Sequence, residues 1–217
     1  MCIRDRVSAD PHVQAQAHYR LGILKDENGA PDEAIHHLQS SVELVPDFIE
    51  GRLRLAGILA RLGQLVEAAD HFDMVIRTEP DSMQAHFGRA MARILAERYS
   101  AARLDLEASL VVFPQEISLL HALARLLATC PDDAVRDAER ALSLAQSVFE
   151  RSPAIAHAET VAMALAEAGR FTEAVNLQQQ VVDDLTTRGP SETLTQARER
   201  LGRYQQNQVV RAPWRVE

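Results

Sequence analysis

The chain has 217 residues, of which 47% are hydrophobic, 25% charged and only 5% aromatic, and its formal net charge is −8 at pH 7. This is long enough to bury a continuous core, and the scarcity of aromatic residues favours packed helices over sheets. The negative charge is spread along the chain, which argues against a nucleic-acid partner, and no apolar run is long enough to span a membrane.

A period of 34 residues organises most of the chain. Small residues at this spacing let two helices approach closely, and a proline just past the second helix ends it. The period therefore predicts a row of helical hairpins. The recurring residues are Pro46, Pro80 and Pro114; Ala34, Ala68 and Ala102; Leu38, Phe72 and Leu106; and, on the first helix, Gly22, Ala56 and Ala90.

The chain opens with two segments that lie outside this row. Residues 1–6, MCIRDR, resemble the translation of a sequencing adapter, so we exclude them from the fold. Residues 7–11 end in Asp-Pro 35 residues before Pro46, where an earlier repeat would close, and are interpreted as the remnant of that repeat. We therefore expect residues 12–27 to expose an apolar face and to fray or self-associate. Localisation stays open, because targeting information would lie upstream.

Five hairpin units follow. Gly29 and Gly63 mark the turn within the first two units, since glycine enters the left-handed region at little cost. In the fourth unit, Ala124 and Ala141 are 17 residues apart instead of 12, which predicts a turn about five residues longer. The expected ranges are 12–46, 47–80, 81–114, 115–153 and 154–187.

The C-terminal part is predicted to close the array. Gly189 and Pro190 break the pattern, and a helix over residues 190–206 carries one apolar stripe. Such a cap covers the hydrophobic face of the last repeat. The stripe consists of Leu194, Ala197, Leu201 and Tyr204, and the tail 207–217 is expected to be irregular.

The hairpins resemble the tetratricopeptide repeat. The resemblance is carried by AHYRLGILKDENGAPDEAIHHLQSSVELVPD and AHFGRAMARILAERYSAARLDLEASLVVFPQ, and LARLLATCPDDAVRDAERALSLAQ is similar to the C-terminal part of many bacterial members. It implies an all-α fold, a right-handed α-solenoid of about five repeats with a C-terminal capping helix. It also implies a concave groove, lined by the first helix of each unit, that holds a protein or peptide partner.

The resemblance places ten residues in that groove, although each could instead pack between units. They are Tyr19, Ile23, Leu53, Phe87, Met91, Ile94, His121, Arg125, Glu159 and Met163. The carboxylate clamp of chaperone-binding members is not expected, because its slots hold Tyr19, Leu53 and Phe87.

No catalytic constellation is evident, and neither a cofactor nor a metal is expected. His36 and His37 are neighbours on a helix and point about 100° apart, which favours surface or interhelical packing. Cys130 has no adjacent base, and a buried, inert thiol is favoured. Arg89 and Arg93 replace apolar residues, which leaves open a structural ion pair or a ligand-facing role.

The leading hypothesis is a non-enzymatic protein-interaction scaffold. The alternative is a docking or oligomerisation arm of a larger enzyme, such as a glycosyltransferase, a sulfotransferase or a haem protein, with its catalytic domain upstream. A third possibility is an enzyme or metal protein that uses His36, His37, His121 and Cys130.

Overall fold

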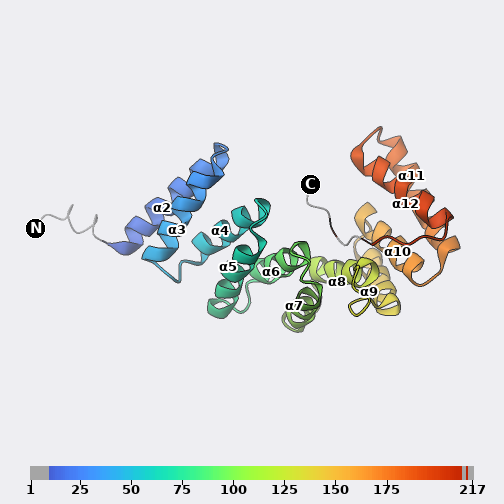
Figure 1. Ribbon diagram of the computed structural model, residues 1–217, viewed down its shortest axis with the longest axis horizontal. Coiled ribbons are helices and arrows are strands. Elements are labelled where there is room, and N and C mark those ends of the chain that lie inside the picture. The colour runs from blue at the N-terminus through green and yellow to red at the C-terminus, as the bar shows by residue number, and fades with distance from the viewer. Residues whose placement is uncertain (1–9, 212–213, 215–217) are drawn as a thin grey trace, which may run out of the picture. The chain divides into compact units, whose positions relative to one another are not determined.

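The computed structural model describes residues 10–211 and residue 214 (Figure 1). These residues form eleven α-helices and no strand, which confirms the all-α prediction. The helices are α2 (Pro11–Glu27), α3 (Pro31–Leu44), α4 (Ile49–Arg61), α5 (Leu65–Thr78), α6 (Met83–Leu95), α7 (Tyr99–Val112), α8 (Ile117–Thr129), α9 (Ala138–Arg151), α10 (Ile155–Glu167), α11 (Phe171–Thr187) and α12 (Glu192–Gln205).

The N-terminal end begins with a capped helix. The side chain of Asp10 accepts a hydrogen bond from the backbone N–H of His12, and Pro11 is the first residue of α2. The sequence interpretation places both residues in the remnant of an earlier repeat. Residues 1–9, which carry the adapter interpretation and the rest of that remnant, lie outside the described residues.

Short turns join the two helices of the regular hairpins. Gly29, Gly63 and Gly169 all have φ between 73° and 79°, and Glu97 takes the same place with φ of 57°. Only three residues separate α10 from α11, whereas residues 130–137 separate α8 from α9. The longer turn is therefore found where the wider alanine spacing predicted it.

The chain divides into two compact units, which we describe one at a time. Unit 1 ends at Ala96 and holds α2 to α6; unit 2 begins at Glu97 and holds α7 to α12. In unit 1 the recurring small and apolar residues form the core, as the period predicts. A Cβ atom at Gly22 would lie 2.6 Å from Cγ of Leu38, so glycine permits close contact between α2 and α3. The core includes Ala34, Leu38, Leu55, Ala56, Leu59, Ala68, Phe72 and Val75.

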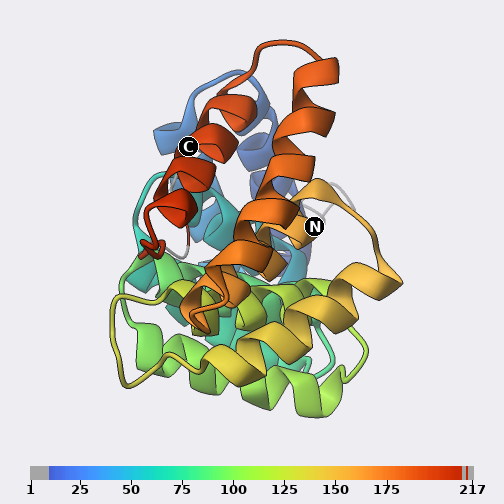
Figure 2. The same cartoon turned by 90° about the vertical axis from the view of Figure 1, so that its right-hand side faces the viewer.

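In unit 2 the central helix is α10, which contacts α8, α9 and α11 and is buried at every position from 158 to 166. The capping helix α12 packs beside α11 (Figure 2). Its predicted stripe, Leu194, Ala197, Leu201 and Tyr204, is buried, and the Ser191 hydroxyl caps its first turn by accepting from the backbone N–H of Leu194. A cap at this end of the array is therefore confirmed.

Polar side chains 19 residues apart join the two helices of three hairpins. Nδ1 of His18 lies 3.2 Å from Nδ1 of His37 across α2 and α3, and Nη1 of Arg52 lies 3.4 Å from Nδ1 of His71 across α4 and α5. In unit 2, Nε2 of Gln178 on α11 donates to Oε1 of Glu159 on α10 at 3.4 Å. These contacts recur at one structural position, and we call them the polar pairs.

The outer face of α2 remains exposed. Val13, Leu21 and Leu24 are 45%, 41% and 51% exposed, and they border a hollow with His12 and Arg20. The exposed apolar face predicted for residues 12–27 is therefore present. Within the described part of the chain, every helix is too short or too polar to cross a membrane.

Candidate binding site

The ten predicted groove residues all lie on the first helices of the hairpins. Tyr19 and Ile23 lie on α2, Leu53 on α4, Phe87, Met91 and Ile94 on α6, His121 and Arg125 on α8, and Glu159 and Met163 on α10. Five of them line two cavities, one within each unit, and the other five do not.

The cavity of unit 1 has a volume of about 400 Å³ and lies among α2, α4 and α6. Tyr19 and Leu53 form apolar wall, and Gly57 provides open space because nothing lies within 4 Å of the position of its missing Cβ atom. The complete lining is Tyr19, Asp26, Glu50, Leu53, Arg54, Gly57, Ile58, Arg61 and Gln84.

One buried carboxylate organises the polar side of this cavity. Asp26 is 7% exposed and accepts a hydrogen bond from Nη2 of Arg54 at 2.9 Å, and it also pairs with Arg61. Two guanidinium groups on α4 are thus fixed on the wall by one carboxylate on α2. A carboxylate with this little exposure needs such partners to offset its desolvation.

The remaining predicted residues of unit 1 lie outside the cavity lining. Ile23, Phe87 and Met91 are half-buried, and Ile94 is 2% exposed. The burial of Ile94 favours the packing role for this residue. Arg89 lies on the same helix, and its Nη1 donates to Oδ1 of Asp73 at 2.7 Å. This contact is an ion pair, as the structural hypothesis for Arg89 expects.

The cavity of unit 2 has a volume of about 590 Å³ and brings together α8, α10, α12 and the segment after α12. Of the predicted residues, Arg125, Glu159 and Met163 line it. The sequence does not indicate the contribution of α12 and the tail, because its pattern predicts only a cap and an irregular end there. Those additional residues are Thr193, Gln196, Glu199, Arg200, Arg203, Val210, Arg211 and Trp214.

Buried charge dominates this second cavity. Glu159 is 8% exposed, and Nη1 of Arg200 donates to its Oε1 at 2.5 Å. Burial, aided by the nearby Arg200, lowers the pKa of Arg125 to about 10, so Arg125 remains cationic at neutral pH. The Nε of Arg125 and the hydroxyl of Tyr204 are buried and have no hydrogen-bond partner among the described residues, and burial raises the pKa of Tyr204.

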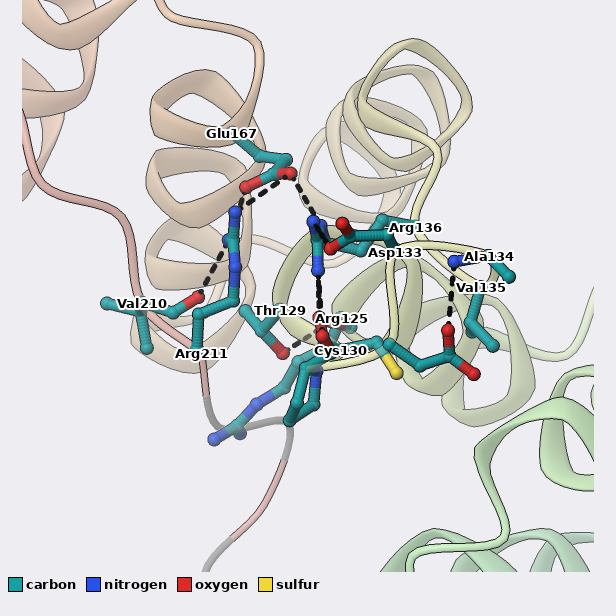
Figure 3. Close-up of polar contacts among 12 residues, drawn as sticks. Arg125, Thr129, Cys130, Asp133, Ala134, Val135, Arg136, Glu167, Val210 and Arg211 are labelled. Carbon is teal, nitrogen blue, oxygen red and sulfur yellow. Dashed lines mark hydrogen bonds and ion pairs between the residues drawn. The ribbon is translucent and has the colours of Figure 1, made fainter.

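The tail residues make two contacts with the first helices of unit 2. Arg211 forms an ion pair with Glu167 at the end of α10, where its Nη2 lies 3.3 Å from Oε1 (Figure 3). The guanidinium carbon of Arg125 on α8 lies 4.8 Å from the centre of the Trp214 ring. Trp214 therefore packs against α8.

His121 lies in the interface between α8 and α10. Its Nε2 is 2.8 Å from Oγ1 of Thr160, and its ring contacts the ring of His157 with centroids 4.6 Å apart. Burial, with the nearby charges of His157 and Arg125, lowers the pKa of His121 to about 4. His121 is therefore neutral and packs between helices.

The other chemistry-bearing side chains have structural surroundings. Cys130 is buried at the start of the long turn, and burial raises the pKa of its thiol. Its carbonyl accepts from Nη1 of Arg136 at 2.8 Å, and Nε of Arg136 also binds Glu167 at 2.9 Å (Figure 3). His37 pairs with His18, as described above. Among the described residues, no three His, Cys, Asp or Glu side chains gather as metal ligands do.

The paired helices, their repeated core and the cap define an all-α helical repeat protein. Residues 27–94 match the family model described as Tetratricopeptide repeat. The match covers this segment of the chain, and the paired helices of the structure have the fold of that repeat.

Solved structures with this fold share little sequence with the chain. MamA (residues 41 to the end) from Desulfovibrio magneticus RS-1 has a TM-score of 0.71 at 17% identity, covering 82% of this chain and 98% of that one. YrrB, described as a TPR protein with an unusual peptide-binding site, has a TM-score of 0.68 at 13% identity, covering 93% and 99%. PilW, a type IV pilus biogenesis factor, has a TM-score of 0.68 at 18% identity, covering 89% and 86%. A comparison with curated proteins gave no match.

Proposed function

We propose that this protein is a non-enzymatic scaffold that binds an extended segment of a partner protein along the first helices of its hairpins. The tetratricopeptide repeat fold is in general a protein-interaction scaffold. The observation that carries the finer proposal is the placement of two cavities on these helices, each combining apolar wall with fixed charges. Such a surface suits an extended peptide, whose apolar side chains fill the hollows while its polar groups meet the charges.

The similarity to YrrB supports the proposal, since that protein of the same fold is described as having a peptide-binding site. The walls are also pre-organised. In unit 1, Asp26 holds both Arg54 and Arg61 in place, so little side-chain entropy is lost when a partner binds. A docking arm of a larger enzyme would use the same surface in the same way.

The test blocks one cavity without disturbing the core. Gly57→Arg places a long side chain in the open space of the unit 1 cavity, and Val66→Arg adds the same charge to α5, where Val66 is 47% exposed. Peptides are first selected from a random library on the unmodified protein, and their Kd values are then measured for both variants. We expect at least about a tenfold loss of affinity in Gly57→Arg and no change in Val66→Arg.

A library that gives no saturable binder would count against the proposal. Selected peptides that bind Gly57→Arg and Val66→Arg equally well would do the same for the unit 1 cavity. Circular dichroism and thermal unfolding of both variants check that the fold is kept.

A further inference from the structure

The chain reverses direction immediately after the capping helix. Asn207 has φ of 54°, its N–H donates to the carbonyl of Tyr204, and the N–H of Gln208 donates to the carbonyl of Arg203 at 2.8 Å. These two bonds form a Schellman motif, which ends a helix and turns the chain back over it. Residues 208–211 therefore leave α12 toward the first helices of unit 2, and Val209 and Val210 are half-buried there.

Two side chains, three residues apart, anchor this tail to two successive first helices. Arg211 pairs with Glu167 of α10, and the Trp214 ring lies against the guanidinium of Arg125 of α8. Arg–carboxylate pairing is geometrically specific, and a cation over an indole ring is the most favourable cation–π arrangement. Arg211 and Trp214 thus contact neighbouring first helices in the way that side chains of a bound peptide ligand would.

Glu167, which the tail contacts, keeps a charged partner when the tail leaves. Glu167 is 11% exposed and would be costly to leave unpaired, but Arg136 also binds it. Arg136 is itself fixed by the carbonyls of Cys130 and Pro131, at 2.8 Å and 3.1 Å, so the long turn holds this second partner in place (Figure 3). Departure of Arg211 leaves Glu167 neutralised and positioned, which is what a reversible occupant requires.

We propose that the tail is an intramolecular occupant of the surface of α8 and α10 beside the unit 2 cavity, and that the partner bound there is an extended peptide with an arginine and, three residues later, an aromatic side chain. This inference rests on the proposed function and specifies its ligand for unit 2. The partner displaces the tail, because both use Glu167 and Arg125. The tail thereby sets a threshold, since a tethered competitor acts at an effective concentration of about millimolar.

The test adds the tail as a separate peptide to a full-length variant whose own tail lacks both anchor side chains. In the double variant Arg211→Ala/Trp214→Ala the helices are unchanged and no tryptophan remains, because Trp214 is the only one in the sequence. A synthetic peptide with the sequence of residues 207–217, labelled at its N-terminus, is titrated with the double variant and with the unmodified protein. We expect saturable binding to the double variant at least about tenfold tighter than to the unmodified protein.

Two matched controls define the site. A peptide with alanine at both anchor positions should not bind the double variant. Adding Arg125→Ala to the double variant should weaken binding of the natural peptide, whereas adding Arg188→Ala, which removes an exposed arginine of the same unit, should not. In the unmodified protein, Arg125→Ala should shift the Trp214 emission to the red as the ring becomes more exposed.

Equal affinity for the double variant and the unmodified protein would overturn the inference, as would failure of the peptide to saturate the double variant. The proposed function is judged separately. If library peptides still bind in a manner sensitive to Gly57→Arg, the scaffold proposal stands while the tail inference fails.

Discussion

The two terminal helices of the described array differ in how they use their apolar residues. On α12 these residues form one stripe, so that Leu194, Ala197, Leu201 and Tyr204 are buried against the array and the opposite face is polar. On α2 they lie on two faces: Ala15 and Gly22 are buried toward unit 1, while Val13, Leu21 and Leu24 are exposed. A helix with one apolar stripe closes an array, and a helix with two apolar faces presents a surface for a further contact.

The largest expected effect, which tests whether α12 is packed more firmly than α2, comes from replacing one leucine on each helix by alanine. Leu201→Ala takes away a side chain that is 8% exposed, and we expect it to lower the free energy of unfolding of unit 2 by about 2–5 kcal/mol. Leu24→Ala, at a position 51% exposed, should change the free energy of unfolding of unit 1 by no more than about 0.5 kcal/mol. Urea unfolding with hydrogen exchange resolved by segment measures both. Equal losses would show that α2 is as firmly packed as α12.

A second prediction concerns the stability of unit 2 on acidification. His121 has a pKa of about 4 in folded unit 2 and about 6.5 when unfolded, so the unfolded state binds more protons between these values. Stability should therefore fall as the pH is lowered from about 6.5 to about 4, by about 2–3 kcal/mol from this group. His121→Gln should remove this contribution to the loss of stability. Urea unfolding of both proteins at about pH 7 and about pH 4.5 measures it. The unmodified protein, unfolded at the same two pH values, is the reference for this comparison.

The smallest effect concerns the exposed face of α2. We expect the protein to self-associate weakly through Val13, Leu21 and Leu24, with a Kd of about millimolar to micromolar. Leu24→Glu should abolish this association while changing the free energy of unfolding by no more than about 0.5 kcal/mol. Leu104→Glu, at a position 66% exposed on α7, is the matched control. Sedimentation velocity over a range of concentrations measures the association. The prediction is contradicted if the unmodified protein is a monomer at every concentration, or if Leu24→Glu and Leu104→Glu associate equally.

The sequence predicted the fold well because the fold depends on periodic, local signals. Gly22 must be small because α3 lies against it, and Pro46 must end a helix, so each constraint repeats at 34 residues and is visible without any coordinates. The same holds for the long fourth turn, since an insertion shifts the alanine spacing directly. The stripe of α12 was found by helical periodicity alone.

The candidate site was only partly predictable, because it depends on contacts between segments far apart in sequence. Arg125, Glu159 and Met163 were found by their position in the repeat. The pairing of Glu159 with Arg200, 41 residues later, and of Glu167 with Arg211, 44 residues later, follows no period. A usable signal was present in the tail, where an arginine and the only tryptophan of the sequence stand three residues apart.

The polar pairs bear on how an array of similar hairpins avoids mispairing. Each pair occupies the same position, yet the chemistry changes from His18–His37 to Arg52–His71 to Glu159–Gln178. Helices exchanged between hairpins would keep their apolar fit but would lose these contacts, so that Glu159 would face His37 or His71 and not Gln178. A polar contact at one shared position can thus give each hairpin its pairing specificity. It favours the correct helix partner over a swapped one, whereas the hydrophobic pattern alone would accept both.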